Sequence, residues 1–400
     1  MFNELSALPA DPILGLMALY TNDQNPNKID LGVGVYKDEN GNTPVLNSIK
    51  TAEKALIESQ LSKAYVGPMG DLEFNALLPK LMFGEQSAVL RDGRLSALQT
   101  PGGCGALRVA AELIRVAMPK ARLWVSDPTW GNHIPLLGGA GLEIKTYPYY
   151  NPSTHGLDFE AMMMALNEIP AGDLLLLHGS CHNPTGVDLT NSQWDSVAEI
   201  CTRRGLIPFV DMAYQGFGDG LDEDAYGLRK LASTVPEMLL AASCSKNFGL
   251  YRERTGLVGV MCESSVTAAA VSTHLLSICR GIYSMPPAHG ASLVASVLGD
   301  SALRAEWIAE LEHMRQRIQG LRKQFSATMR ELTSSSHFDF VEQQKGMFSF
   351  LGLNLECVKR LQSEHSIYML ASSRASIAGM NEKSVPVICQ AIVSTLQFNS

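Results

Sequence analysis

Leu239-Leu240-Ala241-Ala242-Ser243-Cys244-Ser245-Lys246-Asn247-Phe248-Gly249-Leu250 is the stretch around which the chain is organised. Its apolar run predicts a buried strand that ends in small hydroxyl and thiol residues, followed by Lys246. Open α/β sheets bind ligands at the carboxyl ends of their strands, which is where Lys246 falls. Burial lowers the pKa of a lysine and leaves more of the neutral amine that attacks carbonyl carbon. Since a lysine taken alone is usually a solvated surface residue, the rest of the chain has to distinguish the two readings.

The composition of the 400-residue chain limits its class. Hydrophobic residues make up 46% and charged residues 18%, which is enough for a large core and roughly two domains. A net charge of -8 disfavours nucleic-acid and anionic-membrane partners, because both need a basic face. Residues 1–19 contain Glu4, Asp11 and two prolines, so they predict neither a signal peptide nor a membrane span. We therefore expect a cytoplasmic protein.

The cysteines and histidines give no sign of a metal. The eight cysteines are scattered without a CxxC pair, and the nine histidines include no HExxH motif. This pattern favours reduced thiols in a large enzyme over a disulfide framework or a zinc site.

Strand-like and helix-like runs alternate through the middle of the chain. Strands are expected at 123–126, 143–147, 173–178, 206–211, 238–243 and 256–262, and helices around 105–117, 159–167, 191–203 and 224–232. The alternation predicts an α/β fold with a mostly parallel sheet covered by helices on both faces. One long helical stretch is expected over 292–332, followed by a small α+β part. Polar residues follow several of the strands, so these strand ends should share one crevice.

Two further features leave alternatives open. Residues 99–110 form a glycine-rich turn that opens a helix, which suits either an anion or close helix packing. Asp211 ends the apolar run 206–210, where a buried carboxylate is costly unless it pairs with a cation. It could equally cap a neighbouring turn.

Several motifs stand in a fixed order along the chain. They are Thr100-Pro101-Gly102-Gly103-x-Gly105-Ala106-Leu107, His182-Asn183-Pro184-Thr185-Gly186, Asp211-x-x-Tyr214-Gln215-Gly216-Phe217, Ser243-x-Ser245-Lys246-Asn247-Phe248 and Arg374. Together they resemble the class I pyridoxal-phosphate-dependent aminotransferases of the aspartate and aromatic amino acid type. The match runs essentially end to end, from Ala10-Asp11-Pro12-Ile13-Leu14 to Ala378-Gly379-Met380.

The resemblance implies a fold type I transferase, with a mostly parallel sheet covered by helices and a smaller α+β domain built from both termini. It places an N-terminal arm at 1–14, the large pyridoxal-phosphate domain at 44–314, and the small domain at 15–43 together with 315–400.

The resemblance also implies how the cofactor ring is held. Lys246 would bind the aldehyde covalently and move a proton between substrate and cofactor carbon. Asp211 would pair with the protonated ring nitrogen, supported by His133 and His178. The phenolate oxygen would accept hydrogen bonds from Tyr214 and Asn183. Trp130 would stack on the ring and touch the substrate. The phosphate ligands would be Gly103, Cys104, Ser243 and Arg254, with Tyr65 from the neighbouring subunit.

Substrate binding follows from the same resemblance. Arg374 would bind the α-carboxylate, and Gly34 would allow close backbone approach. Arg280, contributed across a homodimer with shared active sites, would bind a distal carboxylate, so glutamate and 2-oxoglutarate should form one substrate pair. No metal is implied.

The finer specificity depends on departures from the aspartate-specific pattern. Ala64, Cys104 and Met285 stand where that subgroup usually has asparagine, threonine and asparagine, which would loosen the network around Arg280 and favour an aromatic ring. We therefore expect a ping-pong aromatic amino acid aminotransferase that also uses aspartate. The alternatives are an aspartate aminotransferase proper, a pyridoxal phosphate lyase or decarboxylase, and a non-catalytic cofactor-binding regulator. Ser373 replaces the glycine usual before Arg374, where its side chain could crowd the substrate.

Overall fold

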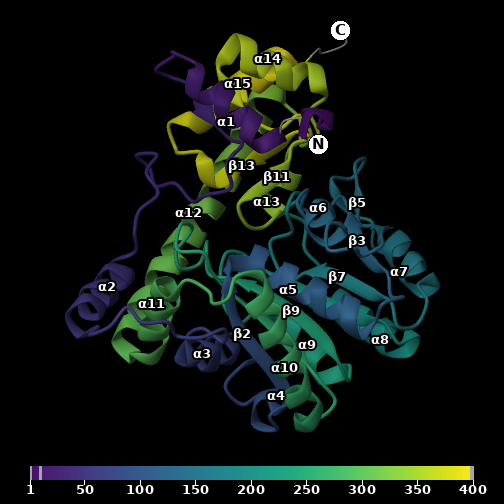
Figure 1. Ribbon diagram of the computed structural model, residues 1–400. Coiled ribbons are helices and arrows are strands. Elements are labelled where there is room, and N and C mark those ends of the chain that lie inside the picture. Colours follow the sequence, from purple (N-terminus) through teal and green to yellow (C-terminus); the bar gives the residue numbers. More distant parts are fainter. Residues whose placement is uncertain (1, 9–10, 397–400) are drawn as a thin grey trace. The chain divides into compact units, whose positions relative to one another are not determined.

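The computed structural model describes residues 2–8 and 11–396, which fold into two compact units (Figure 1). The large unit is Pro44–Arg317, and the small unit combines Met1–Thr43 with Ile318–Ser400. Pro9 and Ala10, which belong to the expected arm and to the start of the family match, lie outside the described residues. The boundary between the units falls inside helix α12 (Ser301–Thr333).

A seven-stranded sheet of order β2-β10-β9-β8-β7-β3-β4 forms the centre of the large unit. Strand β10 runs antiparallel to both β2 and β9, and the other neighbouring strands pair in parallel. This confirms the predicted α/β fold with a mostly parallel sheet. The strands are β2 (Leu95–Pro101), β3 (Leu123–Asp127), β4 (Ile144–Pro148), β7 (Leu174–His178), β8 (Ile207–Met212), β9 (Met238–Ser243) and β10 (Thr255–Met261).

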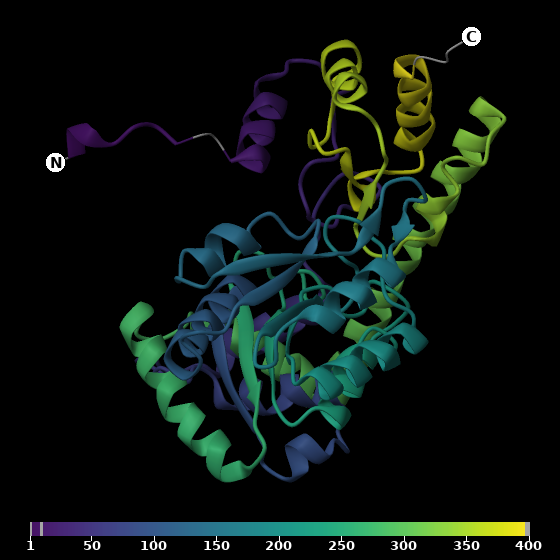
Figure 2. The same cartoon turned by 90° about the vertical axis from the view of Figure 1, so that its right-hand side faces the viewer.

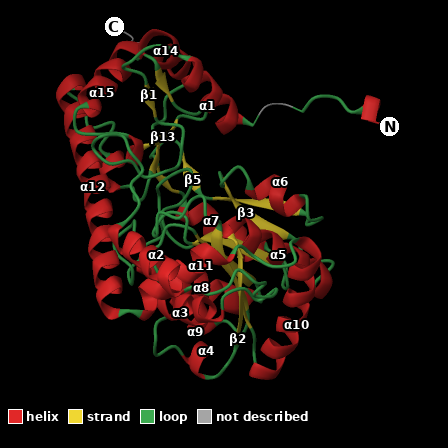
Figure 3. Cartoon of the chain, turned by 60° about the vertical axis from the view of Figure 1, so that its left-hand side comes forward, coloured by secondary structure: helices red, strands yellow, loops and turns green. Residues whose placement is uncertain are grey.

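Both faces of this sheet are buried. Leu174, Leu176 and Phe209 point to the face that packs against α5, α6 and α10, while the alternate residues Leu175 and Leu177 are buried on the opposite face. Side chains of successive strand residues point to opposite faces, so near-continuous apolar strands are what a doubly covered parallel sheet requires. Figure 3 shows strands enclosed by helices, and Figure 2 shows α10, in green, along one side of the large unit.

The helices of the large unit include those expected from the sequence near 105, 159, 191 and 224. They are α2 (Asn47–Ser59), α3 (Leu72–Phe83), α4 (Ala88–Arg91), α5 (Gly102–Ala117), α6 (His133–Gly138), α7 (Phe159–Glu168), α8 (Asn191–Arg204), α9 (Tyr226–Thr234), α10 (Ser265–Ile282) and α11 (Ala288–Gly299), with the short strands β5 (Tyr150–Asn151) and β6 (Gly156–Leu157).

The single long helix expected over 292–332 is wrong, because the structure has two helices there, α11 and α12. Asp300 separates them. Its carboxylate accepts the backbone N–H groups of Ala302 and Leu303, at 2.8 and 2.9 Å, and so caps the start of α12.

The small unit joins the two ends of the chain, drawn in purple and yellow in Figure 1. Strand β1 pairs in parallel with β12, and β11 pairs antiparallel with β13. Its elements are η1 (Phe2–Glu4), α1 (Pro12–Asn22), β1 (Ile29–Asp30), α13 (Phe340–Gln343), β11 (Phe348–Phe350), α14 (Leu355–His365), β12 (Ile367–Tyr368), β13 (Arg374–Ser376), η2 (Ile377–Gly379) and α15 (Ser384–Thr395).

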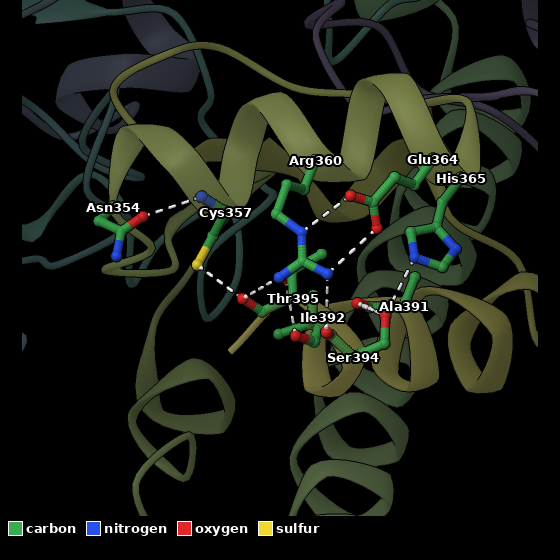
Figure 4. Close-up of polar contacts among 9 residues, drawn as sticks. All are labelled: Asn354, Cys357, Arg360, Glu364, His365, Ala391, Ile392, Ser394 and Thr395. Carbon is green, nitrogen blue, oxygen red and sulfur yellow. Dashed lines mark hydrogen bonds and ion pairs between the residues drawn. The ribbon is translucent and has the colours of Figure 1, made fainter. Parts of the chain in front are cut away.

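Helix α14 closes the carboxyl end of α15 through polar contacts (Figure 4). Arg360 donates to the backbone carbonyls of Thr395 and Ser394, both at 3.2 Å, and is itself paired with Glu364. The last carbonyls of a helix have no partner within the helix, so these bonds fix where α15 ends. Across the described part of the chain, we find no helix with the length and apolar character needed to span a bilayer.

Candidate active site

Lys246 lies just beyond the carboxyl end of β9, where the sequence predicted it. Its Nζ is 4.6 Å from the centroid of the Tyr214 ring, which follows the neighbouring strand β8. An aromatic face attracts a protonated amine, so the ring favours this position of the lysine head group. The structure therefore brings two of the expected catalytic side chains together.

Asp211 lies in β8 beside His178 of β7. Its Oδ2 is 2.9 Å from Nε2 of His133, which is fully buried. Burial by itself would raise the pKa of Asp211, but the hydrogen bond from His133 and its electrostatic attraction lower the pKa below its usual value. Oδ1 of Asp211 accepts no hydrogen bond from the described residues, so this oxygen can accept one from a cationic N–H.

A chain of hydrogen bonds behind Asp211 fixes the histidine tautomers. Burial lowers the pKa of His178 to about 3, so its ring is neutral near pH 7. Nδ1 of His178 accepts the backbone N–H of Asn183 at 3.4 Å, so its proton is on Nε2, 3.2 Å from the Thr129 hydroxyl. That hydroxyl then donates to Nδ1 of His133 at 2.8 Å, and His133 donates from Nε2 to Asp211. His133 is therefore oriented so that its Nε2 faces the carboxylate.

Trp130 and Asn183 lie at the ends of the neighbouring strands. The Trp130 ring meets His133 edge to face, with centroids 5.2 Å apart. Asn183 and Tyr214 are buried, and the Tyr214 carbonyl accepts the N–H of Phe217 at 3.0 Å. The ends of β3, β7, β8 and β9 thus gather the residues that the sequence assigned to the cofactor ring.

The glycine-rich turn before α5 forms a cradle suited to an anion. A Cβ atom on Gly103 would lie 3.1 Å from Cβ of Ser243, and one on Gly102 would lie 2.6 Å from Nη2 of Arg254. Arg254 also donates to the Ser245 hydroxyl at 3.4 Å. Unpaired N–H groups at a helix start, a guanidinium and hydroxyls together favour a phosphate.

Gly102 and Ser245 also line this cradle, although neither was predicted to do so from the sequence. Gly102 has a φ of 69°, a left-handed conformation that favours glycine, and Ser245 accepts from Arg254 inside the Ser243-x-Ser245 motif. The sequence feature that could have indicated Ser245 is its hydroxyl, the second in that motif. Cys104 stands in the same turn, 4.0 Å from Nδ2 of Asn132, and burial raises the pKa of its thiol.

Tyr65 and Arg280 are not joined to this group. Tyr65 is 93% exposed, and the exposed Arg280 donates to the Ser284 hydroxyl at 2.5 Å. Among the described residues, no hydrogen bond, ion pair or ring contact connects either side chain to Lys246 or Asp211.

Gly34 and Arg374 belong to the small unit. The Arg374 guanidinium donates to the Gly32 carbonyl at 2.7 Å and lies over the Phe348 ring, with Cζ 4.2 Å from its centroid. A Cβ on Gly34 would be 2.7 Å from the same ring, so Gly34 leaves room for this stacking. The guanidinium is therefore held in one orientation by its own unit.

Comparison with known proteins agrees with this geometry. The sequence profile of the family described as aminotransferase class I and II matches residues 26–392. The chain belongs to this family. It is a pyridoxal-phosphate-dependent aminotransferase, and its substrates are amino acids and 2-oxo acids.

Relatives with both specificities match the whole chain. It is 48% identical over 396 residues to the aspartate aminotransferase of Escherichia coli (strain K12), covering 99% of this chain and 100% of that protein. It is 45% identical over 393 residues to the aromatic-amino-acid aminotransferase of Paracoccus denitrificans, covering 98% and 99%. The structure of the aromatic-amino-acid aminotransferase from Burkholderia pseudomallei, covalently bound to pyridoxal phosphate, matches with a TM-score of 0.97 at 40% identity, covering 99% and 100%. The predicted family, fold, activity and cofactor are confirmed.

Proposed function

We propose that this aminotransferase acts on tyrosine and phenylalanine and also on aspartate, with 2-oxoglutarate as the amino-group acceptor in a ping-pong reaction. The observation that carries the dual range is the setting of Arg280, an exposed guanidinium whose side-chain partner is the Ser284 hydroxyl of its own segment. Ala64 and Met285 add no strong polar partner that would hold it for a dicarboxylate alone. Relatives named for aspartate and for aromatic amino acids match at similar identity, which supports the same range.

Residues at the strand ends hold the cofactor in this proposal. Lys246 would bind the aldehyde carbon covalently, and the carboxylate of Asp211 would pair with the protonated ring nitrogen. Asn183 and Tyr214 would hold the phenolate oxygen, and Trp130 would stack on the ring. The phosphate ligands are Gly103, Cys104, Ser243 and Arg254 of the same chain and Tyr65 of the neighbouring subunit. The open glycine cradle and the unused oxygen of Asp211 support this fit.

The chemistry divides between cofactor and protein. Bound pyridoxal phosphate accepts the electrons released when a bond at the Cα atom of the amino acid breaks. In the first half of the reaction Lys246 would move the Cα proton to the cofactor carbon, and in the second half it would move a proton from that carbon to the Cα atom of the incoming oxo acid. Asp211 stays ionised because its pKa is lowered, and its charge keeps the ring nitrogen protonated.

Arg374 binds the α-carboxylate of either substrate through its planar pair of N–H donors, and Gly34 allows the substrate close backbone approach. The bond to the Gly32 carbonyl and the stacking on Phe348 support this role, since both hold the guanidinium before substrate arrives.

We also propose that the protein is a homodimer in which Tyr65 and Arg280 serve the neighbouring subunit. The segment between α2 and α3 exposes large apolar side chains, with Leu61 98% and Tyr65 93% exposed, and Ile57 and Val66 beside them. A patch of this kind marks an interaction surface, and a second copy would cover it. The eight free cysteines support a reducing compartment, which we propose is the cytoplasm.

The test is a comparison of kcat/KM for tyrosine, phenylalanine and aspartate, each with 2-oxoglutarate. We expect all three to be turned over at comparable kcat/KM, because a site without polar partners fixing Arg280 discriminates only weakly between a distal carboxylate and an aromatic ring. Turnover of aspartate alone would identify an aspartate aminotransferase proper. Release of ammonia or carbon dioxide without glutamate would instead identify a lyase or decarboxylase.

A further inference from the structure

Ser373 has an unusual backbone conformation directly before Arg374. Its φ is 68°, in the left-handed region that glycine adopts readily and that a side chain makes costly. The residue is 2% exposed, so the strain lies in the interior of the small unit. A buried left-handed residue that is not glycine persists only where its surroundings hold it.

Three hydrogen bonds hold Ser373. Its backbone N–H donates to the Leu370 carbonyl at 2.8 Å, and its carbonyl accepts the N–H of Leu351 at 3.0 Å. The side-chain hydroxyl oxygen accepts the backbone N–H of Leu353 at 2.9 Å, a bond that glycine cannot make. The hydroxyl is therefore engaged with the main chain that follows β11, and the expected crowding of a substrate by this side chain has no support in the small unit.

The same contacts reach Arg374. Arg374 is the first residue of β13 and pairs with Phe350 of β11, in the strand that also carries Phe348. The hydrogen bonds from Leu351 and Leu353 thus connect Ser373 to the end of β11. That strand also carries Phe348, whose ring lies under the Arg374 guanidinium. Loosening residue 373 would let the start of β13 shift relative to that ring.

We propose that Ser373 is a positioning residue for substrate binding, whose hydroxyl locks the left-handed turn before Arg374 and so fixes the guanidinium over Phe348. The inference rests on the proposed role of Arg374 in binding the α-carboxylate. The hydroxyl bond offsets the backbone strain of Ser373. Without the hydroxyl, the buried N–H of Leu353 would lose its hydrogen-bond partner.

The experiment measures carboxylate binding and turnover in the holoenzyme. Ser373→Ala keeps the side-chain carbon and removes the hydroxyl. Ser373→Gly removes the hydroxyl and also relieves the backbone strain, so this variant tests the hydroxyl even if Ser373→Ala folds poorly. Ser376→Ala is the matched control, because Ser376 is fully buried two residues beyond Arg374 and its hydroxyl has no hydrogen-bond partner among the described residues. The probe is 3-phenylpropionate, which has a carboxylate but no amino group and cannot react.

Both Ser373 variants should bind 3-phenylpropionate about tenfold more weakly by calorimetry and raise KM for tyrosine similarly, with kcat within about twofold. Ser376→Ala should match the unmodified enzyme. Equal affinity in Ser373→Ala, Ser373→Gly and Ser376→Ala would overturn the inference, as would a fall in kcat with KM unchanged. Arg374→Ala separates the two proposals: if it binds the probe normally, the role of Arg374 is wrong, and if it loses the probe while the Ser373 variants keep it, only the Ser373 inference is wrong.

Discussion

The charge of Asp211 can be removed with almost no change in the shape of its side chain. Asp211→Asn keeps the size of the side chain but removes the charge that would keep a ring nitrogen protonated. We expect kcat to fall on the order of 10³-fold, equivalent to about 4 kcal/mol in the barrier. Because the pKa of Asp211 is lowered, the unmodified enzyme should show no loss of activity from this group between pH 5 and 8.

Asp127→Asn is the matched control, since Asp127 is an exposed carboxylate at the carboxyl end of β3. Stopped-flow measurement of the half-reaction with tyrosine checks both variants. A loss below about tenfold in Asp211→Asn would contradict the assigned role. At this scale the apolar runs before Lys246 and Asp211 drew attention to both residues, and the resemblance of the surrounding motifs to a family supplied their predicted roles. The role of Gly102 could not be predicted from the sequence, because it depends on Arg254, which is distant in sequence and adjacent only in the fold.

Helix α2 (Asn47–Ser59) begins without a capping side chain of its own, because Leu46 precedes it. Glu310 of α12 takes that place. Its Oε1 accepts the N–H of Asn47 at 2.6 Å, and its Oε2 accepts the N–H and hydroxyl of Ser48 at 3.1 and 2.7 Å. A carboxylate at a helix start also interacts favourably with the helix dipole. Glu310→Gln should therefore lower the free energy of unfolding by about 1–2 kcal/mol.

Urea denaturation of the holoenzyme checks this, with Glu306→Gln as the control, because Glu306 is exposed one turn earlier on α12. Equal midpoints for the two variants would show that the cap contributes nothing. The same kind of distant contact explains where element prediction failed. Strand β2 was not anticipated because its second half contains the buried polar residues Gln99 and Thr100. Its place beside β10 is set by pairing with residues far along the chain.

At the scale of the whole molecule, the sequence predicted the family and the sheet, since its motifs follow the strand ends in order. The homodimer stays a prediction, because its contacts involve a second chain. Exposed Tyr65 and Arg280 have no bond to Lys246 among the described residues, which fits the proposal that they serve a second copy. The apolar patch around Leu61 gives the physical reason for such a copy, because burying apolar area is the main driving force of association.

Mixed dimers decide whether Arg280 acts across the interface. Arg280→Ala alone should lower kcat/KM for aspartate at least about 100-fold and for tyrosine less than about fivefold, because only aspartate has a distal carboxylate to pair. Lys246→Ala alone should be inactive. In a dimer of one Lys246→Ala chain and one Arg280→Ala chain, the site with an intact lysine receives an intact Arg280 from its partner. Aspartate turnover should then return to about half of the unmodified level per dimer. If Arg280 served its own subunit, the mixed dimer would show only the residual aspartate turnover of Arg280→Ala. Refolding the two variants together, isolating the mixed dimer and assaying aspartate and tyrosine therefore separates the two arrangements.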